Sequence, residues 1–113
     1  MRKRIYVAGP YSASTREERE ENVARMIEVG DKIFQAGGAP FLPVLSHYWD
    51  LYSPKGYEDW MEIVSPWVCG ADALYRTMGR SRRADREVDI ACINGVPVYF
   101  EYDSDEFWVW LRS

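Results

Sequence analysis

The chain has 113 residues, of which 47% are hydrophobic and 28% are charged, and its formal net charge at pH 7 is −4. This length predicts a single domain over residues 1–113, and the acidic balance argues against nonspecific nucleic-acid binding. No apolar run reaches the roughly 20 residues that span a bilayer, and the chain starts as a strand pattern rather than a signal peptide, so we expect a cytoplasmic protein without membrane contact.

The first third of the chain predicts a buried strand followed by a helix. The apolar run at 4–8 ends at Gly9, which is typical of a strand in a parallel sheet. Ser14 and Thr15 stand at capping-box spacing before two glutamates, so a helix should begin there and end at Gly37. Five residues should form its buried face: Val23, Met26, Ile27, Gly30 and Phe34.

Prolines and turn residues shape the middle of the chain. Residues 39–45 predict a second strand, and its two prolines favour a position at the edge of the sheet. The aromatic-rich segment 46–56 is expected to be a loop. A helix is predicted over 57–69, and Pro66 should kink it or end it.

The last third predicts two further strands, over 72–77 and 96–100, and two helices, over 82–94 and 104–111. Strands that alternate with helices indicate a parallel sheet with right-handed crossovers. We therefore expect an α/β fold: an open parallel sheet of about four to five strands in a flavodoxin- or Rossmann-like three-layer sandwich.

The most informative segment is 76–87, which reads RTMGRSRRADRE and holds five arginines in an acidic chain. Cations at the start of a helix oppose the helix dipole, so helix stability does not explain them. They are explained if an anion such as a phosphate binds there. Glu87 is the lone glutamate among them, about one turn inside the helix. The buried face of this helix is predicted to hold Ala84, Val88, Ala91 and Cys92.

The predicted sheet places its ligand crevice outside the carboxyl ends of the strands, at the point where the strand order reverses. The segments that follow the first three strands, 9–12, 43–47 and 78–87, should therefore meet there. The candidate site residues in these segments are Gly9, Tyr11, Ser46, His47, Gly79, Arg80, Ser81, Arg82 and Glu87.

Other residue types support few special sites. Cys69 and Cys92 are expected to be small buried hydrophobic residues rather than a disulfide or zinc site. No cluster has metal-ligand spacing, and neither a GxGxxG motif nor a P-loop is present, so we expect no metal and no cofactor. Trp108 and Trp110 exceed what a small core needs, which favours a homo-oligomer such as a dimer.

Six blocks of the sequence, taken in order, resemble the nucleoside 2-deoxyribosyltransferase superfamily, which includes the 2'-deoxynucleoside 5'-phosphate N-hydrolases. The blocks cover most of the chain: IYVAGPYS (5–12), PFLPVLSH (40–47), YEDWM (57–61), GADAL (70–74), SRRADREVDIA (81–91) and GVPVYF (95–100). The resemblance implies that Glu87 attacks the anomeric carbon of a (deoxy)ribosyl group. It also implies that Ser81 helps to hold the phosphate and that Tyr11 lines the sugar site.

The chain departs from that superfamily at two positions. Val64 stands where relatives commonly carry an aspartate, which affects protonation of the leaving base and positioning of the sugar. Arg83 stands where glycine is usual, and it either blocks close approach of the substrate or adds a phosphate ligand. Three carboxylates are unranked candidates for protonating the base: Asp50, Asp59 and Asp85.

Each site residue also has an ordinary structural interpretation. Glu87 could be a surface glutamate paired with Arg83 or Arg86, whereas a nucleophile must be ionised, and we expect the arginines and the helix start to lower its pKa. Ser81 could serve only as a helix cap, and His47 could be a structural group.

The leading hypothesis is an enzyme that cleaves the N-glycosidic bond of a (deoxy)nucleoside 5'-monophosphate through a covalent glycosyl-glutamate, followed by hydrolysis or by transfer to another base. The first alternative is a non-catalytic module that binds a nucleotide or an ADP-ribose-like ligand and regulates a partner. The second is a scaffold that uses its tryptophans for protein contacts.

Overall fold

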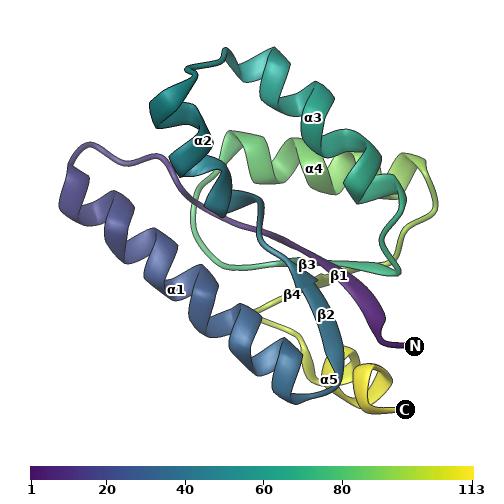
Figure 1. Cartoon of the computed structure of the whole chain (residues 1–113). Helices are drawn as coiled ribbons and strands as arrows, with labels where there is room; N and C mark the ends of the chain where they lie inside the picture. The colour runs from purple at the N-terminus through teal and green to yellow at the C-terminus, as the bar shows by residue number, and fades with distance from the viewer.

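Strands and helices alternate along the whole chain, as the sequence predicts (Figure 1). The computed structural model describes residues 1–113, except that the side chain of His47 lies outside the description. The elements are β1 (Lys3–Ala8), α1 (Arg16–Gln35), β2 (Gly38–Phe41), the 3-10 turn η1 (Pro43–Ser46), α2 (His47–Tyr52), α3 (Tyr57–Cys69), β3 (Ala73–Arg76), α4 (Arg82–Ile93), β4 (Val98–Phe100) and α5 (Asp105–Arg112).

The four strands form one sheet in the order β2-β1-β3-β4, and every neighbouring pair is parallel. Helices α1 and α5 cover one face of this sheet and helices α3 and α4 cover the other (Figure 1). The structure therefore confirms the predicted three-layer α/β sandwich and the edge position of β2.

The alternation of side chains along β1 divides the core into two halves. Ile5 and Val7 point toward α1 and α5, whereas Tyr6 and Ala8 point toward α3 and α4. All four residues are buried, because both faces of this central strand are covered by helices. Tyr6 is thus directed toward the layer that contains the arginine-rich helix.

Two expectations for the middle of the chain are wrong. Strand β2 ends at Phe41 rather than at residue 45, and the turn η1 begins at Pro43, whose ring cannot supply a ladder N–H. Segment 46–56 is not entirely a loop, because His47–Tyr52 forms the short helix α2. The helix α3 continues through Pro66 to Cys69, since Pro66 lies in its last turn.

Helical faces also differ from the prediction in detail. In α1 the buried positions are Met26, Val29, Gly30 and Ile33. Ile27 and Phe34, which were expected on that face, are exposed. Cys69 and Cys92 are exposed rather than buried, because each lies at or near the carboxyl end of its helix.

The two C-terminal tryptophans pack within the chain. The ring of Trp110 stacks on Tyr99 at 5.8 Å between centroids, and Trp108 meets Phe107 edge-on at 4.9 Å. Both are partly buried against the core half formed by α1 and α5. The intrachain packing removes the reason for assigning these rings to a subunit contact, and the dimer stays a prediction.

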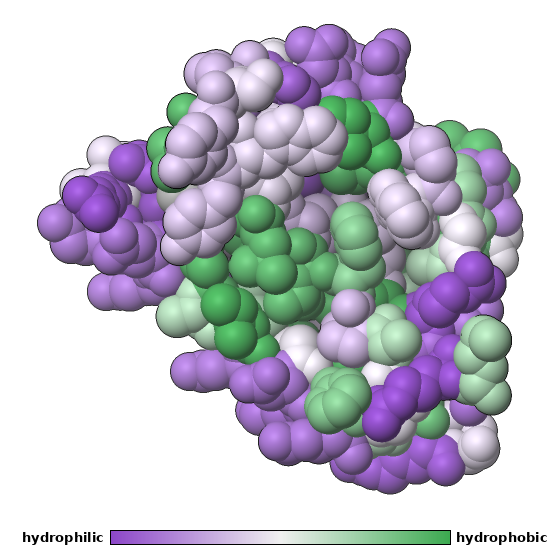
Figure 2. Space-filling view, viewed as in Figure 1, coloured by the Kyte–Doolittle hydropathy of each residue, from purple (hydrophilic) through white to green (hydrophobic). Residues whose placement is uncertain are grey.

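An exposed apolar surface lies beside the edge strand β2. Figure 2 shows apolar side chains gathered between α1 and α3, where a groove of about 840 Å³ includes Phe34, Phe41, Leu45 and Trp67. Among the described residues, no helix combines the length and apolarity needed to cross a bilayer.

Candidate active site

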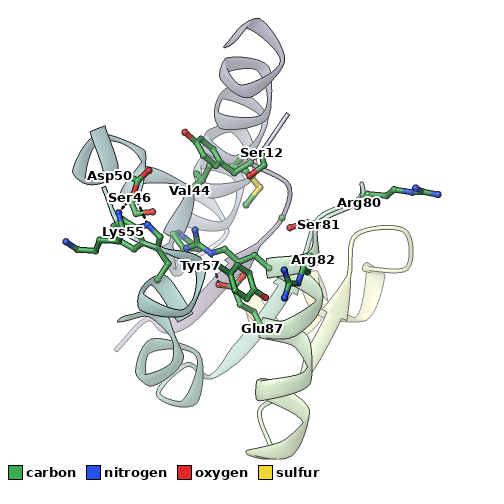
Figure 3. A pocket seen from close by; sticks show the side chains of 16 residues that line it. Ser12, Val44, Ser46, Asp50, Lys55, Tyr57, Arg80, Ser81, Arg82 and Glu87 are labelled. Carbon is green, nitrogen blue, oxygen red and sulfur yellow. Dashed lines mark hydrogen bonds and ion pairs between the residues drawn. The ribbon is translucent and has the colours of Figure 1, made fainter. Parts of the chain in front are cut away.

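A cavity of about 500 Å³ lies at the carboxyl ends of β1 and β3. Its lining residues are Gly9, Tyr11, Ser12, Met26, Pro43, Val44, Ser46, Asp50, Lys55, Tyr57, Trp60, Arg80, Ser81, Arg82, Arg83 and Glu87. They come from the segments that follow β1, β2 and β3, as the rule for open parallel sheets requires. In Figure 3, Asp50 and Lys55 lie on one side, Ser81 and Arg82 on the other, and Glu87 between them.

Seven of the nine candidate site residues line this cavity. They are Gly9, Tyr11, Ser46, Arg80, Ser81, Arg82 and Glu87. Gly79 does not: it lines a separate shallow hollow together with Phe100 and Tyr102. The interpretation of His47 as a substrate contact lies outside the described part of the chain, because its side chain is not described.

Glu87 is buried at the floor of the cavity. It shares the inward stripe of α4 with Ala84 and Ala91, and its exposed fraction is 1%. The predicted stripe instead included Val88, which is half-buried, and Cys92, which faces solvent. A glutamate at a core position is costly unless it is paired, so its partners define the site.

The carboxylate of Glu87 has two partners on the protein. The phenolic hydroxyl of Tyr6 donates a short hydrogen bond to Oε2, and Nε of Arg83 lies 3.5 Å from the same oxygen. The structure thus shows the ion pair with Arg83 that an ordinary surface glutamate would make, but in a buried setting. Arg86 is directed elsewhere and pairs with Glu58 at 2.7 Å.

Burial dominates the titration of this pair. Desolvation raises the pKa of Glu87 above its usual range, although the hydrogen bond from Tyr6 and the charge of Arg83 act in the opposite direction. Arg83 and Arg76 do act to lower this pKa, as the sequence predicts, but burial outweighs them, so the expected net lowering is wrong. Burial and the charge of Glu87 also raise the pKa of Tyr6, so Tyr6 remains a neutral donor.

The first turn of α4 lies at the cavity, where the sequence predicts an anion site. Ser81 caps the helix, and its hydroxyl accepts a hydrogen bond from the Ala84 amide at 3.0 Å. The amides of Arg82 and Arg83 precede the first intrahelical bond, so they remain available to an acceptor at the cavity. Amides and dipole at a helix start favour a phosphate or carboxylate ligand.

The five arginines of residues 76–87 divide into different roles. Arg76 pairs with Asp85, Arg83 with Glu87 and Arg86 with Glu58. The guanidinium of Arg82 stacks on the ring of Tyr57 at 4.3 Å, at the cavity wall. Arg80 lines the cavity, and Figure 3 shows the end of its side chain directed outward.

Hydrogen bonds from Arg76 fix the turn that precedes α4. Its buried guanidinium donates to the carbonyl oxygens of Thr77 and Gly79 and to Asp85 in the first turn of α4. Gly79 has a φ of +111°, and a Cβ there would meet Pro10 at 2.7 Å, in the loop after β1. Gly79 therefore shapes the turn instead of lining the cavity.

Sequence reasoning named Asp50 as one of three unranked carboxylates but missed the rest of the wall formed by α2 and α3. The indole of Trp60 donates to Oδ1 of Asp50 at 2.9 Å, and the Lys55 amide donates to the same oxygen at 3.0 Å. These two bonds hold a carboxylate at the cavity, opposite the start of α4 (Figure 3). Hydrophobic periodicity does not reveal this wall, because α2 has only six residues. The hydrogen bonds that form the wall join Asp50 to Lys55 and Trp60, which come later in the chain.

The structure ranks the three carboxylates that were candidates for protonating a leaving base. Only Asp50 lines the cavity. Asp59 accepts a hydrogen bond from the Gly56 amide at the start of α3, and Asp85 pairs with Arg76. Asp50 is therefore the carboxylate that can reach a ligand.

The two departures from the superfamily have different structural consequences. Val64 is buried in the core half formed by α3 and α4, and it does not line the cavity. Arg83 lines the cavity beside Glu87. The substitution that bears on ligand binding is therefore the arginine.

Comparison with solved structures finds a 2-deoxyribosyltransferase from the psychrotolerant bacterium Bacillus psychrosaccharolyticus, with a TM-score of 0.58 and 19% sequence identity. The match covers 86% of this chain and 70% of that chain. No family model matches the sequence, and no curated protein matches it.

The chain shares its fold with a 2-deoxyribosyltransferase. At 19% identity the match establishes the architecture, which the resemblance had implied. The closer relationship to N-hydrolases remains a prediction, and the chemistry must be argued from the cavity itself.

In the described part of the chain, no group of three His, Cys, Asp or Glu side chains is placed to hold a metal ion. The cavity combines the buried carboxylate of Glu87 and the helix start of α4 with aromatic surfaces on Tyr11, Tyr57 and Trp60, and it is also lined by Asp50, Lys55 and three arginines. This combination suits an anionic ligand with a planar apolar part.

Proposed function

We propose that the protein cleaves the N-glycosidic bond of a nucleoside 5'-monophosphate, with Glu87 as the nucleophile. The observation that carries the proposal is the position of Glu87. Its carboxylate is buried, is held by Tyr6 and Arg83, and still lines a cavity of about 500 Å³. A cavity of this size accommodates a mononucleotide.

The substrate lies across the cavity. Its phosphate binds at Ser81 and the free amides of α4, where the dipole and nearby arginines favour an anion. Its base lies toward Trp60 and Asp50 on the opposite wall. This orientation places the anomeric carbon over Glu87 in the middle.

The reaction proceeds in two displacements. The Glu87 carboxylate attacks C1' and forms a glycosyl ester, while the bond from C1' to the base nitrogen breaks and the base leaves with its electron pair and gains a proton. Asp50 lies on the base side, and in its carboxylic acid form it donates that proton to the base nitrogen and becomes a carboxylate. Water, or another base in a transfer reaction, then attacks C1' and releases Glu87 with net retention.

The test is release of free base from a panel of ribo- and deoxyribonucleoside monophosphates by the purified protein. Glu87→Gln keeps the shape of the side chain and removes the nucleophile, so we expect base release to fall by about 1,000-fold or more. Activity that survives this substitution would overturn the assignment of Glu87.

The ion pair between Arg83 and Glu87 favours a second candidate, a non-catalytic module that binds a nucleotide or an ADP-ribose-like ligand. The positive charge of Arg83 next to the Glu87 carboxylate can reduce its nucleophilicity. This candidate predicts that nucleotides raise the melting temperature while no base is released at any pH. Base release that depends on Glu87 excludes it.

A further inference from the structure

Arg83 carries a buried nitrogen without a partner in the wall of the cavity. Its Nη2 is fully buried and makes no hydrogen bond, although the Nε of the same guanidinium lies 3.5 Å from Glu87. The side chain as a whole is 23% exposed. Buried donors of this kind are rare, because a charged group that gives up its contact with water without gaining a hydrogen-bond acceptor destabilises the fold.

Tyr57 provides a second unsatisfied donor in the same cavity. Its hydroxyl is buried and makes no hydrogen bond. Arg82 and Arg86 lie over the ring of Tyr57, at 4.3 and 5.5 Å from its centroid, and a guanidinium only donates, so neither supplies an acceptor for the O–H. Two donors, one on α4 and one on α3, therefore lack an acceptor on residues that line the cavity.

The position of Arg83 identifies the acceptor. The atoms of a guanidinium are coplanar and adjacent, so Nη2 lies close to the carboxylate that Nε contacts. A sugar placed for attack of that carboxylate on C1' brings its 2'-substituent to the same place. The 5'-phosphate lies at the other end of the sugar, near Ser81.

We infer that Arg83, together with Tyr57, recognises a 2'-hydroxyl and makes the protein selective for ribonucleotides over 2'-deoxyribonucleotides. This inference rests on the proposed function, because it assumes that the sugar lies over Glu87. A 2'-deoxy sugar presents a C–H at this position and leaves both buried donors unpaired. Sites built to bind a hydroxyl discriminate strongly against the analogue that lacks it.

The experiment compares two reaction products, ribose 5-phosphate and 2-deoxyribose 5-phosphate, by titration calorimetry on the full chain. Both carry the phosphate, so their affinity ratio isolates the 2'-hydroxyl and does not depend on catalysis. We expect the wild-type protein to bind the ribose compound at least about tenfold more tightly.

Arg83→Met and Tyr57→Phe should each move this ratio toward one. Arg25→Met is the matched control, since Arg25 is an ion-paired arginine on α1 that does not line the cavity, and it should keep the wild-type ratio. Tyr57→Phe removes only one hydroxyl, so it tests the inference even if Arg83→Met folds poorly.

Equal affinities in the wild-type protein, or a ratio that both variants retain, would overturn the inference. Its failure is distinguishable from that of the proposed function. Equal base release from ribo- and deoxyribonucleotides, lost in Glu87→Gln, would exclude the 2'-selectivity and keep the enzyme. Absence of base release from either class would remove the catalytic proposal that the inference needs.

Discussion

The hydroxyl of Tyr6, on the central strand β1, donates a hydrogen bond to the buried carboxylate of Glu87 on α4. Tyr6 and Glu87 are each 1% exposed and lie 81 positions apart in the chain. The bond ties the candidate nucleophile to an interior strand that is paired with neighbours on both sides. Tyr6 and Arg83 both contact Oε2 of Glu87, which lines the cavity.

Removing this hydroxyl should change the pH dependence of activity. The bond from Tyr6 stabilises ionised Glu87, so Tyr6→Phe should raise the pKa of Glu87 further and move the acid limb of kcat/KM to higher pH. At pH values on that limb we expect a loss of about tenfold, shrinking as the pH rises. Tyr75→Phe is the matched control, a buried tyrosine on the opposite face of the sheet. An unshifted acid limb in Tyr6→Phe contradicts this account.

The buried charge of Glu87 should also destabilise the fold at neutral pH. Because its folded pKa is raised, the native state holds this proton better than the unfolded chain does, and stability falls as pH rises between the two pKa values. Glu87→Gln removes that fall and keeps an acceptor for Tyr6. Its melting temperature relative to wild type should therefore increase by a few degrees from pH 4 to pH 8.

Glu58 provides the control of opposite sign for that series of thermal melts. Its hydrogen bond from Arg86 lowers its pKa, so its contribution is present above the ordinary carboxyl pKa and is lost as pH falls. Glu58→Gln should have a slightly lower melting temperature than the wild-type protein at neutral pH, and this difference should disappear in acid. If the melting temperature of Glu87→Gln relative to wild type stays constant or decreases toward pH 8, the proposed destabilisation by the buried Glu87 charge is contradicted.

Two helix caps allow stability and ligand binding to be separated. Ser81 caps α4 at the cavity and Thr15 caps α1 through a bond to the Glu18 amide at 3.1 Å. Ser81→Ala and Thr15→Ala should each cost about 1 kcal/mol of stability. Only Ser81→Ala should also weaken binding of a nucleoside monophosphate, by about tenfold, as measured by calorimetry. Equal affinities in the two variants would remove Ser81 from the phosphate site.

The cavity depends on close backbone approach at Gly9. A Cβ at Gly9 would lie 2.0 Å from Oγ1 of Thr77 and 2.7 Å from Sδ of Met26. Gly9→Ala should therefore cost about 1–3 kcal/mol and distort the floor of the site. At Gly56 the nearest atom to such a Cβ is 3.8 Å away, so Gly56→Ala should lose only the preference for glycine over alanine at the N-cap of α3, about 1 kcal/mol or less in urea unfolding. Comparable losses in both variants would contradict the close contact.

The sequence alone was enough to predict the α/β class, the edge position of β2, the cap at Ser81 and the cavity at the strand ends. Those features depend on local signals: apolar runs of strand length, turn residues and cap spacing. Resemblance at six short blocks pointed to the fold that the structure then confirmed.

Only the tertiary structure decided how Glu87 titrates and which residues surround it. Periodicity correctly placed Ala84 and Ala91 on the inward face of α4, but it added Val88 and Cys92 and omitted Glu87, because apolar patterning does not reveal a charged residue at a core position. Burial, partners and the direction of a pKa shift depend on contacts between segments far apart in the chain. Tyr6, Trp60 and Asp50 join the site in this way.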